Sequence, residues 1–288
     1  MAAEDNVIKA ADLAQAREVE FVYRFKENIK ALQRALGVTR PIAKQAGTIL
    51  KAYKAVGTLD DTPVAEGDII PLSKYATEAV PFGEIVLNKY RKASTAESII
   101  GGAYSQAVVK TDEKALRDLQ ASIKSKFYTF LASGEGAATG ANLQKTVAQV
   151  RAQLAIKFED QDVQPVYFIN PVDMADYMGS QQIVTQTAFG MTYFEDFLGL
   201  GTVVEAPAVP AGTVYGTVKD NIVLYYVPVN GADGLGTGFE FTTDETGLVG
   251  IHHVSNYQRM QVETIMVSGL TLFAERIDGI VKGTISGT

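Results

Sequence analysis

The chain has 288 residues, of which 47% are hydrophobic and 20% charged, and it carries a formal net charge of −7. This composition is typical of a globular protein and argues against wholesale disorder. The chain holds no cysteine, which excludes disulfides, thiolate metal sites and cysteine nucleophiles. No run approaches the roughly 18 apolar residues of a membrane span, and the acidic N-terminus is unlike a signal peptide. We therefore expect a cytoplasmic protein with no membrane partner.

Charge is unevenly distributed along the chain. Residues 1–126 carry 19 Lys and Arg against 16 Asp and Glu, a net of +3, whereas residues 127–288 carry 7 against 17, a net of −10. The acidic second half argues against tight nucleic-acid binding by that half. In the first half, we interpret the cations as solvated charge on extended segments, with weak contact to a polyanion as the alternative.

The first predicted element is a helix over residues 12–36. Gly37 is a plausible stop, because glycine readily adopts the left-handed conformation that ends many helices. Apolar side chains recur there at loosely helical spacing, namely Leu13, Ala16, Val19, Tyr23, Ile29, Leu32 and Leu36.

Residues 48–109 have the character of strands. Strands are predicted at 48–56, 68–72, 77–82 and 84–90, and Pro81-Phe82-Gly83 suits a hairpin turn or a bulged bend. Cations gather near these strands, as they do on exposed edges that must avoid uncontrolled pairing, at Lys74, Lys89, Arg91 and Lys92. A two-stranded ribbon of this length is marginal alone, and no other segment is clearly dedicated to covering it. The pattern predicts a ribbon that neighbouring subunits complete.

A long helix over 112–133 is the best-defined prediction. Thr111 is a candidate cap, and Gly134 and Gly136 end the pattern. An apolar stripe runs along one face at spacings of three and four, formed by Leu116, Leu119, Ile123, Phe127, Phe130 and Leu131.

The remaining chain predicts an α+β body. Asn142 opens an amphipathic helix with Leu143, Val147, Val150 and Leu154 inward, residues 165–169 form a buried strand, and Asn170 caps a short helix that begins at Pro171. Further strands are predicted at 202–206, 214–217, 222–227, 239–243, 261–267 and 270–274.

A search for catalytic or ligand-binding chemistry yields little. His252 and His253 are neighbours on a predicted strand, so they point to opposite faces and cannot share a metal ion. The glycine clusters at 199–201 and 231–238 lack the partners of nucleotide-binding loops. The acidic residues Glu159, Asp160 and Asp162 could bind a hard cation, but such a turn is more often simply solvated. We expect no cofactor, no metal and no enzymatic activity.

The order of elements, together with two segments, resembles the major capsid proteins of tailed bacteriophages with the Hong Kong 97-type fold. The order is an N-terminal arm, an extended loop and a long spine helix. The segment Phe197–Val218 (FLGLGTVVEAPAVPAGTVYGTV) is similar to the central part of that family, and Thr271–Ile285 (TLFAERIDGIVKGTI) is similar to its closing segment.

The resemblance implies an α+β subunit with four parts. These are an arm at 1–56, an extended β-ribbon at 57–110, a peripheral domain at 111–140 and 231–270, and an axial domain at 141–230 and 271–288. Candidate contacts between subunits are Lys74, Phe82, Lys89, Arg91 and Lys92.

The same resemblance implies a structural protein of a virion. Such subunits assemble in the bacterial host cytoplasm into hexamers and pentamers of an icosahedral head around double-stranded DNA. It further implies a portal and, because the arm begins almost at once, a separate scaffolding protein. Two alternatives stay open: a nanocompartment shell protein of the same fold, like the encapsulins, and an α+β enzyme or ligand-binding protein.

Overall fold

The computed structural model describes residues 10–37, 41–102, 108–158, 164–179, 186–188, 191–229, 238–243, 245 and 247–287. The acidic turn at 159–162 and the glycine cluster from 231 to 237 lie outside these residues. Helices and strands both contribute to the body, so the α+β prediction is confirmed. The helical elements are α1 (Ala10–Leu36), α2 (Ala96–Gly102), α3 (Lys110–Leu131), α4 (Leu143–Lys157), α5 (Pro171–Met178) and the short 3₁₀ turns η2 (Phe197–Gly199) and η3 (Lys219–Asn221).

The described strands form four sheets. A ribbon pairs β2 (Ile49–Thr58) with β3 (Lys74–Glu84), and a second sheet has the order β12 (Val249–Asn256), β13 (Gln261–Ser268), β4 (Asn88–Thr95). A third has the order β1 (Pro41–Ala43), β11 (Ile222–Tyr226), β14 (Thr271–Ala274). The largest has the order β5 (Gly136–Gly140), β15 (Val281–Ile285), β10 (Thr213–Val218), β6 (Pro165–Ile169), β9 (Thr202–Glu205), β8 (Met191–Phe194), β7 (Gln186–Ala188).

The N-terminal helix α1 packs into the body of its own chain. Its buried face includes Phe25, Ile29 and Leu32, which join one hydrophobic cluster with α3 and the β12–β13 sheet. Val19 and Tyr23, predicted to lie on the apolar face, are instead exposed. The predicted apolar face is therefore correct in the second half of α1, at Ile29, Leu32 and Leu36, and wrong at Val19 and Tyr23, where Phe21, Val22 and Phe25 are buried instead.

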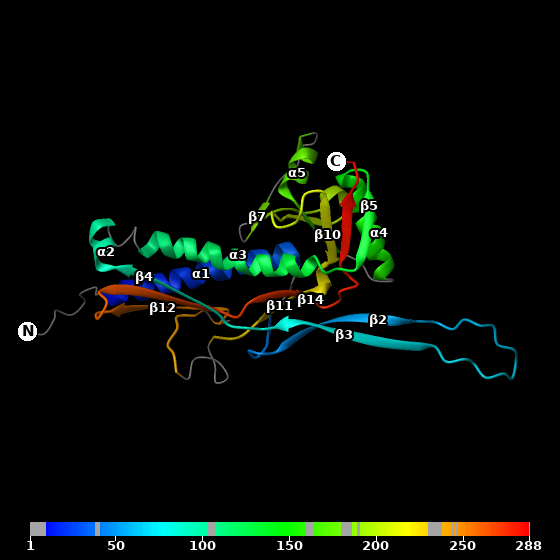
Figure 1. Ribbon diagram of the computed structural model, residues 1–288, viewed down its shortest axis with the longest axis horizontal. Helices are drawn as coiled ribbons and strands as arrows, with labels where there is room; N and C mark the ends of the chain where they lie inside the picture. Colours follow the sequence, from blue (N-terminus) through cyan, green and yellow to red (C-terminus); the bar gives the residue numbers. More distant parts are fainter. Residues whose placement is uncertain are drawn as a thin grey trace, which may run out of the picture.

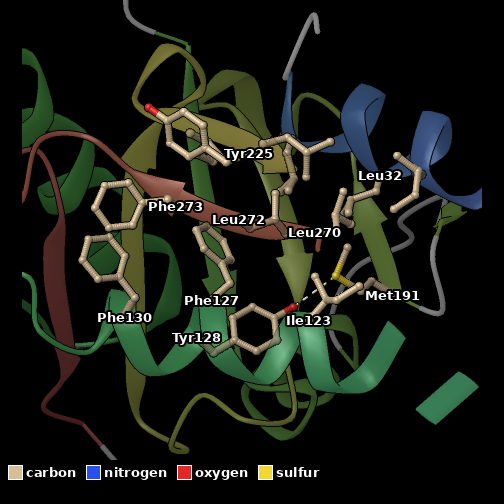
Figure 2. Packing of buried hydrophobic residues seen from close by; sticks show 14 of the residues in the cluster. Leu32, Ile123, Phe127, Tyr128, Phe130, Met191, Tyr225, Leu270, Leu272 and Phe273 are labelled. Carbon is tan, nitrogen blue, oxygen red and sulfur yellow. Dashed lines mark hydrogen bonds between the residues drawn. The ribbon is translucent and has the colours of Figure 1, made fainter. Parts of the chain in front are cut away.

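Helix α3 is the axis of the larger core. All six residues of the predicted stripe are buried, which confirms the spine prediction. Figure 2 shows Phe127 and Phe130 pointing from α3 toward Phe273 and Leu272 of β14, while the Tyr128 hydroxyl donates to Sδ of Met191 at 3.1 Å. The predicted Thr111 cap is wrong: the cap position is Val109, and Thr111 donates its hydroxyl to the Val108 carbonyl inside the helix.

A second, smaller core lies beneath α4 and α5. The predicted caps are confirmed, because Asn142 accepts from the Lys145 amide at 2.8 Å and Asn170 from the Val172 amide at 2.9 Å. Strand β6 is buried on both faces: Val166 and Phe168 join the larger core, and Tyr167 and Ile169 join the smaller one. This position between two cores accounts for its unbroken apolar sequence.

Strands β2 and β3 form a ribbon that leaves the body, and Figure 1 shows it extending well beyond the other elements. The predicted strand at 68–72 is wrong, because these residues belong to the connection between β2 and β3. The predicted strand at 84–90 is broken at residues 85–87, after which β4 pairs with β13 rather than with the ribbon. The predicted strand at 239–243 is reduced to a single bridge between Thr242 and Ile251.

Candidate assembly interface

The ribbon carries apolar side chains that nothing in its own chain covers. Eleven of the 22 exposed large hydrophobic side chains in the described residues lie between 49 and 84. That segment is about an eighth of the chain and holds half of these exposed apolar side chains. An exposed apolar patch of this kind usually marks a contact with another molecule.

The apolar exposure is greatest in the tip loop, residues 59–73. Ile69 is 95% exposed, Ile70 76% and Leu72 95%. The loop nevertheless has internal order. Asp60 accepts from the Thr62 amide and hydroxyl at 3.2 and 2.6 Å, and these bonds lower the pKa of the Asp60 carboxyl. The Asp60 amide in turn donates to the Ser73 hydroxyl at 3.0 Å and joins the two ends of the loop.

The base of the ribbon, in contrast, is fixed to the body. Ala52 and Ile85 are fully buried in the larger core. A β-bulge inserts Phe82, since Leu50 faces Gly83 while Lys51 already faces Pro81. The predicted bulged bend at Pro81-Phe82-Gly83 is thus confirmed.

The bulge turns the Phe82 ring onto the body, edge-on to Phe130 with centroids 4.1 Å apart and 5.8 Å from Phe273. Phe82 remains 44% exposed and lines an open hollow of about 300 Å³ between the ribbon base, α3 and β14. This basal hollow has an apolar wall that includes Leu50, Val86 and Leu272.

The five candidate contact residues separate into two groups. Lys74 and Phe82 lie on the ribbon, and Lys74 is exposed where β3 begins. Lys89, Arg91 and Lys92 lie on β4 within the body, so the structure does not bring all five together. Lys89 is exposed there, whereas the other two are engaged within their own subunit.

Arg91 forms a two-pronged ion pair with Glu263 across β4 and β13, at 2.8 and 2.6 Å. This pairing lowers the pKa of the Glu263 carboxyl to about 2. Lys92 is partly buried and pairs with Asp112 at 2.7 Å. Both cations therefore stabilise contacts inside the subunit.

Lys92 belongs to a buried polar cluster that joins four elements. Asp112 Oδ2 lies 3.3 Å from Nε2 of His253, and Nδ1 of that ring lies 3.0 Å from Glu18 Oε1. Glu18 also accepts from the His253 amide at 2.6 Å and from the Thr242 hydroxyl. We call Glu18, Lys92, Asp112 and His253 the His253 cluster. It links α1, β4, α3 and β12.

Protonation of the His253 cluster follows from its geometry. Burial disfavours the charged imidazole, but hydrogen bonds to Asp112 and Glu18 outweigh it and raise the pKa of His253 to about 9. Burial also disfavours both carboxylates, yet the hydrogen bonds with His253 hold their pKa values below the ordinary ones. The cluster at neutral pH is accordingly a chain of alternating charges.

Sequence reasoning missed two features. One is the tip loop, in which residues 68–72 are predicted as a strand although their apolar side chains stand between turn residues. The His253 cluster joins residues up to 235 positions apart, and the only sequence signal for it is that the two neighbouring histidines point to opposite faces of a strand. The His253 side chain is indeed 4% exposed.

No catalytic arrangement emerges from the part of the chain that the structure describes. In those residues, no group of three or more His, Asp or Glu side chains is placed to hold a metal ion. None of the described helices combines the length and the hydropathy needed to cross a membrane. The described residues instead present exposed apolar side chains on the ribbon, a surface suited to association with another molecule.

An extended ribbon, a long central helix and an α+β body with two cores together define the Hong Kong 97-type capsid fold. Similar structures include the capsid of a native GTA particle (TM-score 0.55, 9% identity, 88% of this chain and 89% of the other). The capsid asymmetric unit of cyanophage A-1(L) has a TM-score of 0.54 at 13% identity, covering 90% and 93% of the two chains. A structure from Mycobacterium phage Che8 has a TM-score of 0.52 at 12% identity, covering 100% and 96%.

No family model and no curated protein sequence matches the chain. At 9 to 13% identity the structural likeness shows the fold alone.

Proposed function

We propose that this protein is the structural subunit of an icosahedral phage-type shell. The observation that carries the proposal is the ribbon: half of the exposed large apolar side chains of the described residues lie on an arm that its own body does not cover. Burying one such side chain fully contributes about 1.5–3 kcal/mol. A subunit that leaves this surface uncovered is suited to association with copies of itself.

The fold supports the same function, because the similar structures from cyanophage A-1(L) and the native GTA particle are capsids. In the proposed shell the tip loop of one subunit lies on the next, as expected for ring-forming heterologous contacts. Lys74, exposed on the ribbon, and Phe82, in the wall of the basal hollow, are the candidate contacts that this geometry favours. Lys89 and Arg91 are proposed for the outer face of the β4 sheet, and Lys92 is proposed to contribute by fixing β4 to α3.

The remaining assembly partners follow from the shell function. We propose hexamers and pentamers, a separate scaffolding protein, a portal, and non-specific proximity to packaged double-stranded DNA. The particle is a virion formed in the bacterial host cytoplasm, and the subunit has no enzymatic activity. The division into an arm (1–56), a ribbon (57–110), and peripheral and axial domains at the boundaries given above stays a prediction.

Electron microscopy of the purified full-length protein tests the function. We expect shells, rings or tubes. The triple variant Ile69→Ser, Ile70→Ser, Leu72→Ser should remain folded but lose assembly, since it removes the exposed apolar surface of the tip loop. The matched control Asp61→Ser, Glu66→Ser changes polar residues in the same loop and should still assemble.

Two outcomes would contradict the proposal. A wild-type protein that stays a discrete monomer or dimer under all conditions is not a shell subunit, and normal shells from the triple variant would show that the tip loop is not a contact. Particles from the natural source also distinguish the nanocompartment alternative, since nuclease-protected DNA indicates a phage head and a protein cargo indicates a nanocompartment.

A further inference from the structure

A second hollow, distinct from the ribbon, lies beside the end of α1. It is open, has a volume of about 360 Å³, and is bounded by the last turn of α1, the middle of α4, the start of β6 and the loop 195–202. Three cations from three separate elements line it: Arg34, Arg151 and Lys219. We call it the three-cation hollow.

The charges around this hollow have no partners within the described part of the subunit. Arg34, Arg151 and Lys219 form no ion pair or side-chain hydrogen bond with another described residue, and the same holds for Glu195 and Asp196, which also line it. Residues 127–288 carry only 7 cations, so the meeting of two of them here is notable for such an acidic region.

The aliphatic stem of Lys219 is packed against Gly37. Gly37 has φ +74°, and a Cβ there would lie 2.2 Å from Cδ of Lys219, so the lysine stem occupies the space that any other residue would fill. The Lys219 amide donates to the Gln164 carbonyl at 3.0 Å. The amino group therefore extends from a fixed stem beside the end of α1, which limits the entropy lost when it binds a ligand.

The loop on the opposite wall has an unusual backbone. Asp196 and Leu198 have φ of 51° and 54°, in the left-handed region that non-glycine residues rarely adopt. The loop is nevertheless fixed, since Phe197 is buried and its amide donates to the Gly201 carbonyl at 2.7 Å. Beside it, Thr202 is 5% exposed and lines the hollow, and its hydroxyl forms no hydrogen bond to a described residue.

We propose that the three-cation hollow binds a tetrahedral oxyanion of the phosphate class. Two arginines and a lysine from three separate elements line the hollow, and phosphate has enough oxygens to accept from all three. Thr202, which is buried and also lines the hollow, offers a fourth, neutral donor. Glu195 and Asp196 also line the hollow and reduce its net lining charge from +3 to +1, which suits one phosphate group at a time, free or within a phosphodiester backbone.

The identity of the natural phosphate ligand rests on the proposed function. In a DNA-filled shell the abundant phosphate is the phosphodiester backbone, so the hollow would be a point contact between an otherwise acidic half and the genome. Free inorganic phosphate has the same chemistry and is the other source.

Titration calorimetry of the full-length protein with inorganic phosphate tests the site, at constant ionic strength maintained with chloride. We expect binding to the wild type that is weakened at least about tenfold in Arg151→Gln, Lys219→Gln. The control Lys145→Gln, Lys157→Gln removes two cations from the same helix α4, outside the hollow, and should bind like the wild type. Glu195→Gln should tighten binding, because it removes a repelling charge.

Fluorescence anisotropy with a short DNA duplex identifies the source. If the phosphodiester is the ligand, Arg151→Gln, Lys219→Gln should weaken duplex binding and reduce its salt dependence, whereas phosphate binding without DNA binding would assign the site to the free anion.

Equal phosphate affinity of the wild type and Arg151→Gln, Lys219→Gln, or no phosphate binding at all, would overturn the site. Electron microscopy of the same variant separates this result from the shell function, since the variant should still assemble.

Discussion

A few buried charged residues hold helix α1 against the body of the subunit. His253 is the point at which Glu18 of α1 and Asp112 of α3 meet, and Lys92 of β4 neutralises the far carboxylate. Buried charges are costly unless they are paired and hydrogen-bonded, and here each has a partner of opposite sign. Removal of one member would leave another buried and unpaired.

The His253 cluster predicts a specific pH dependence. The pKa of His253 is about 9 in the folded protein and about 6.5 in an unfolded chain, so its contribution is complete below about pH 6.5 and is lost as the pH rises through 9. We expect the thermal unfolding midpoint of the wild type to fall more steeply between pH 7 and 10 than that of His253→Gln. The effect is on the order of a few kcal/mol in unfolding free energy.

His252→Gln is the matched control, since His252 lies on the same strand and its ring meets Phe241 edge-on instead of the cluster. It should follow the wild-type profile. Parallel pH profiles of the wild type and His253→Gln in calorimetry would show that the cluster does not link protonation to stability.

At the scale of elements, α3 was predictable because its stripe has the period of a helix and one face meets the core. Phe127 is 2% exposed and lies edge-on to Phe168, with centroids 5.5 Å apart. Phe127→Ala should lower the free energy of unfolding by about 3–5 kcal/mol, through lost burial and the cavity left behind. Denaturant unfolding followed by circular dichroism measures this.

Lys114→Ala is the control on the exposed face of α3. It removes only a surface ion pair with Asp118, which contributes about 0.3–0.5 kcal/mol. A loss in Phe127→Ala no larger than in this control would contradict the role of the stripe in the core.

The ribbon shows where element prediction failed. Alternation indicates strands on both sides of Pro81-Phe82-Gly83, and the sequence leaves a hairpin turn and a bulged bend as the two options there. The structure makes this segment a bulge and places the turn in the tip loop. Local sequence could not distinguish these arrangements, because the pairing of β4 with β13 is decided by residues more than 160 positions away.

At the scale of the whole molecule, the ribbon is separable from the body. Thr58 and Lys74 face each other across the two strands, so an Asn-Gly turn can replace residues 59–73. We expect this variant to fold with a nearly unchanged unfolding midpoint, since the removed loop buries little in its own chain, and to remain unassembled in light scattering.

The boundaries of that replacement matter, because a deletion reaching into 88–95 would remove β4 and with it the Arg91 and Lys92 ion pairs. Normal particles from the shortened ribbon would contradict its role in assembly. Loss of folding would instead show that the tip loop stabilises its own subunit.

The α+β class, the spine helix, the caps at Asn142 and Asn170 and an uncovered ribbon could all be predicted from the amino-acid sequence. These features depend on periodicity and on local hydrogen bonds, which act over a few residues. Long-range packing sets which face of α1 is buried, joins β4 to the body, and creates the His253 cluster and the three-cation hollow. Those features join residues distant in the chain, and their geometry is set by how the two cores pack.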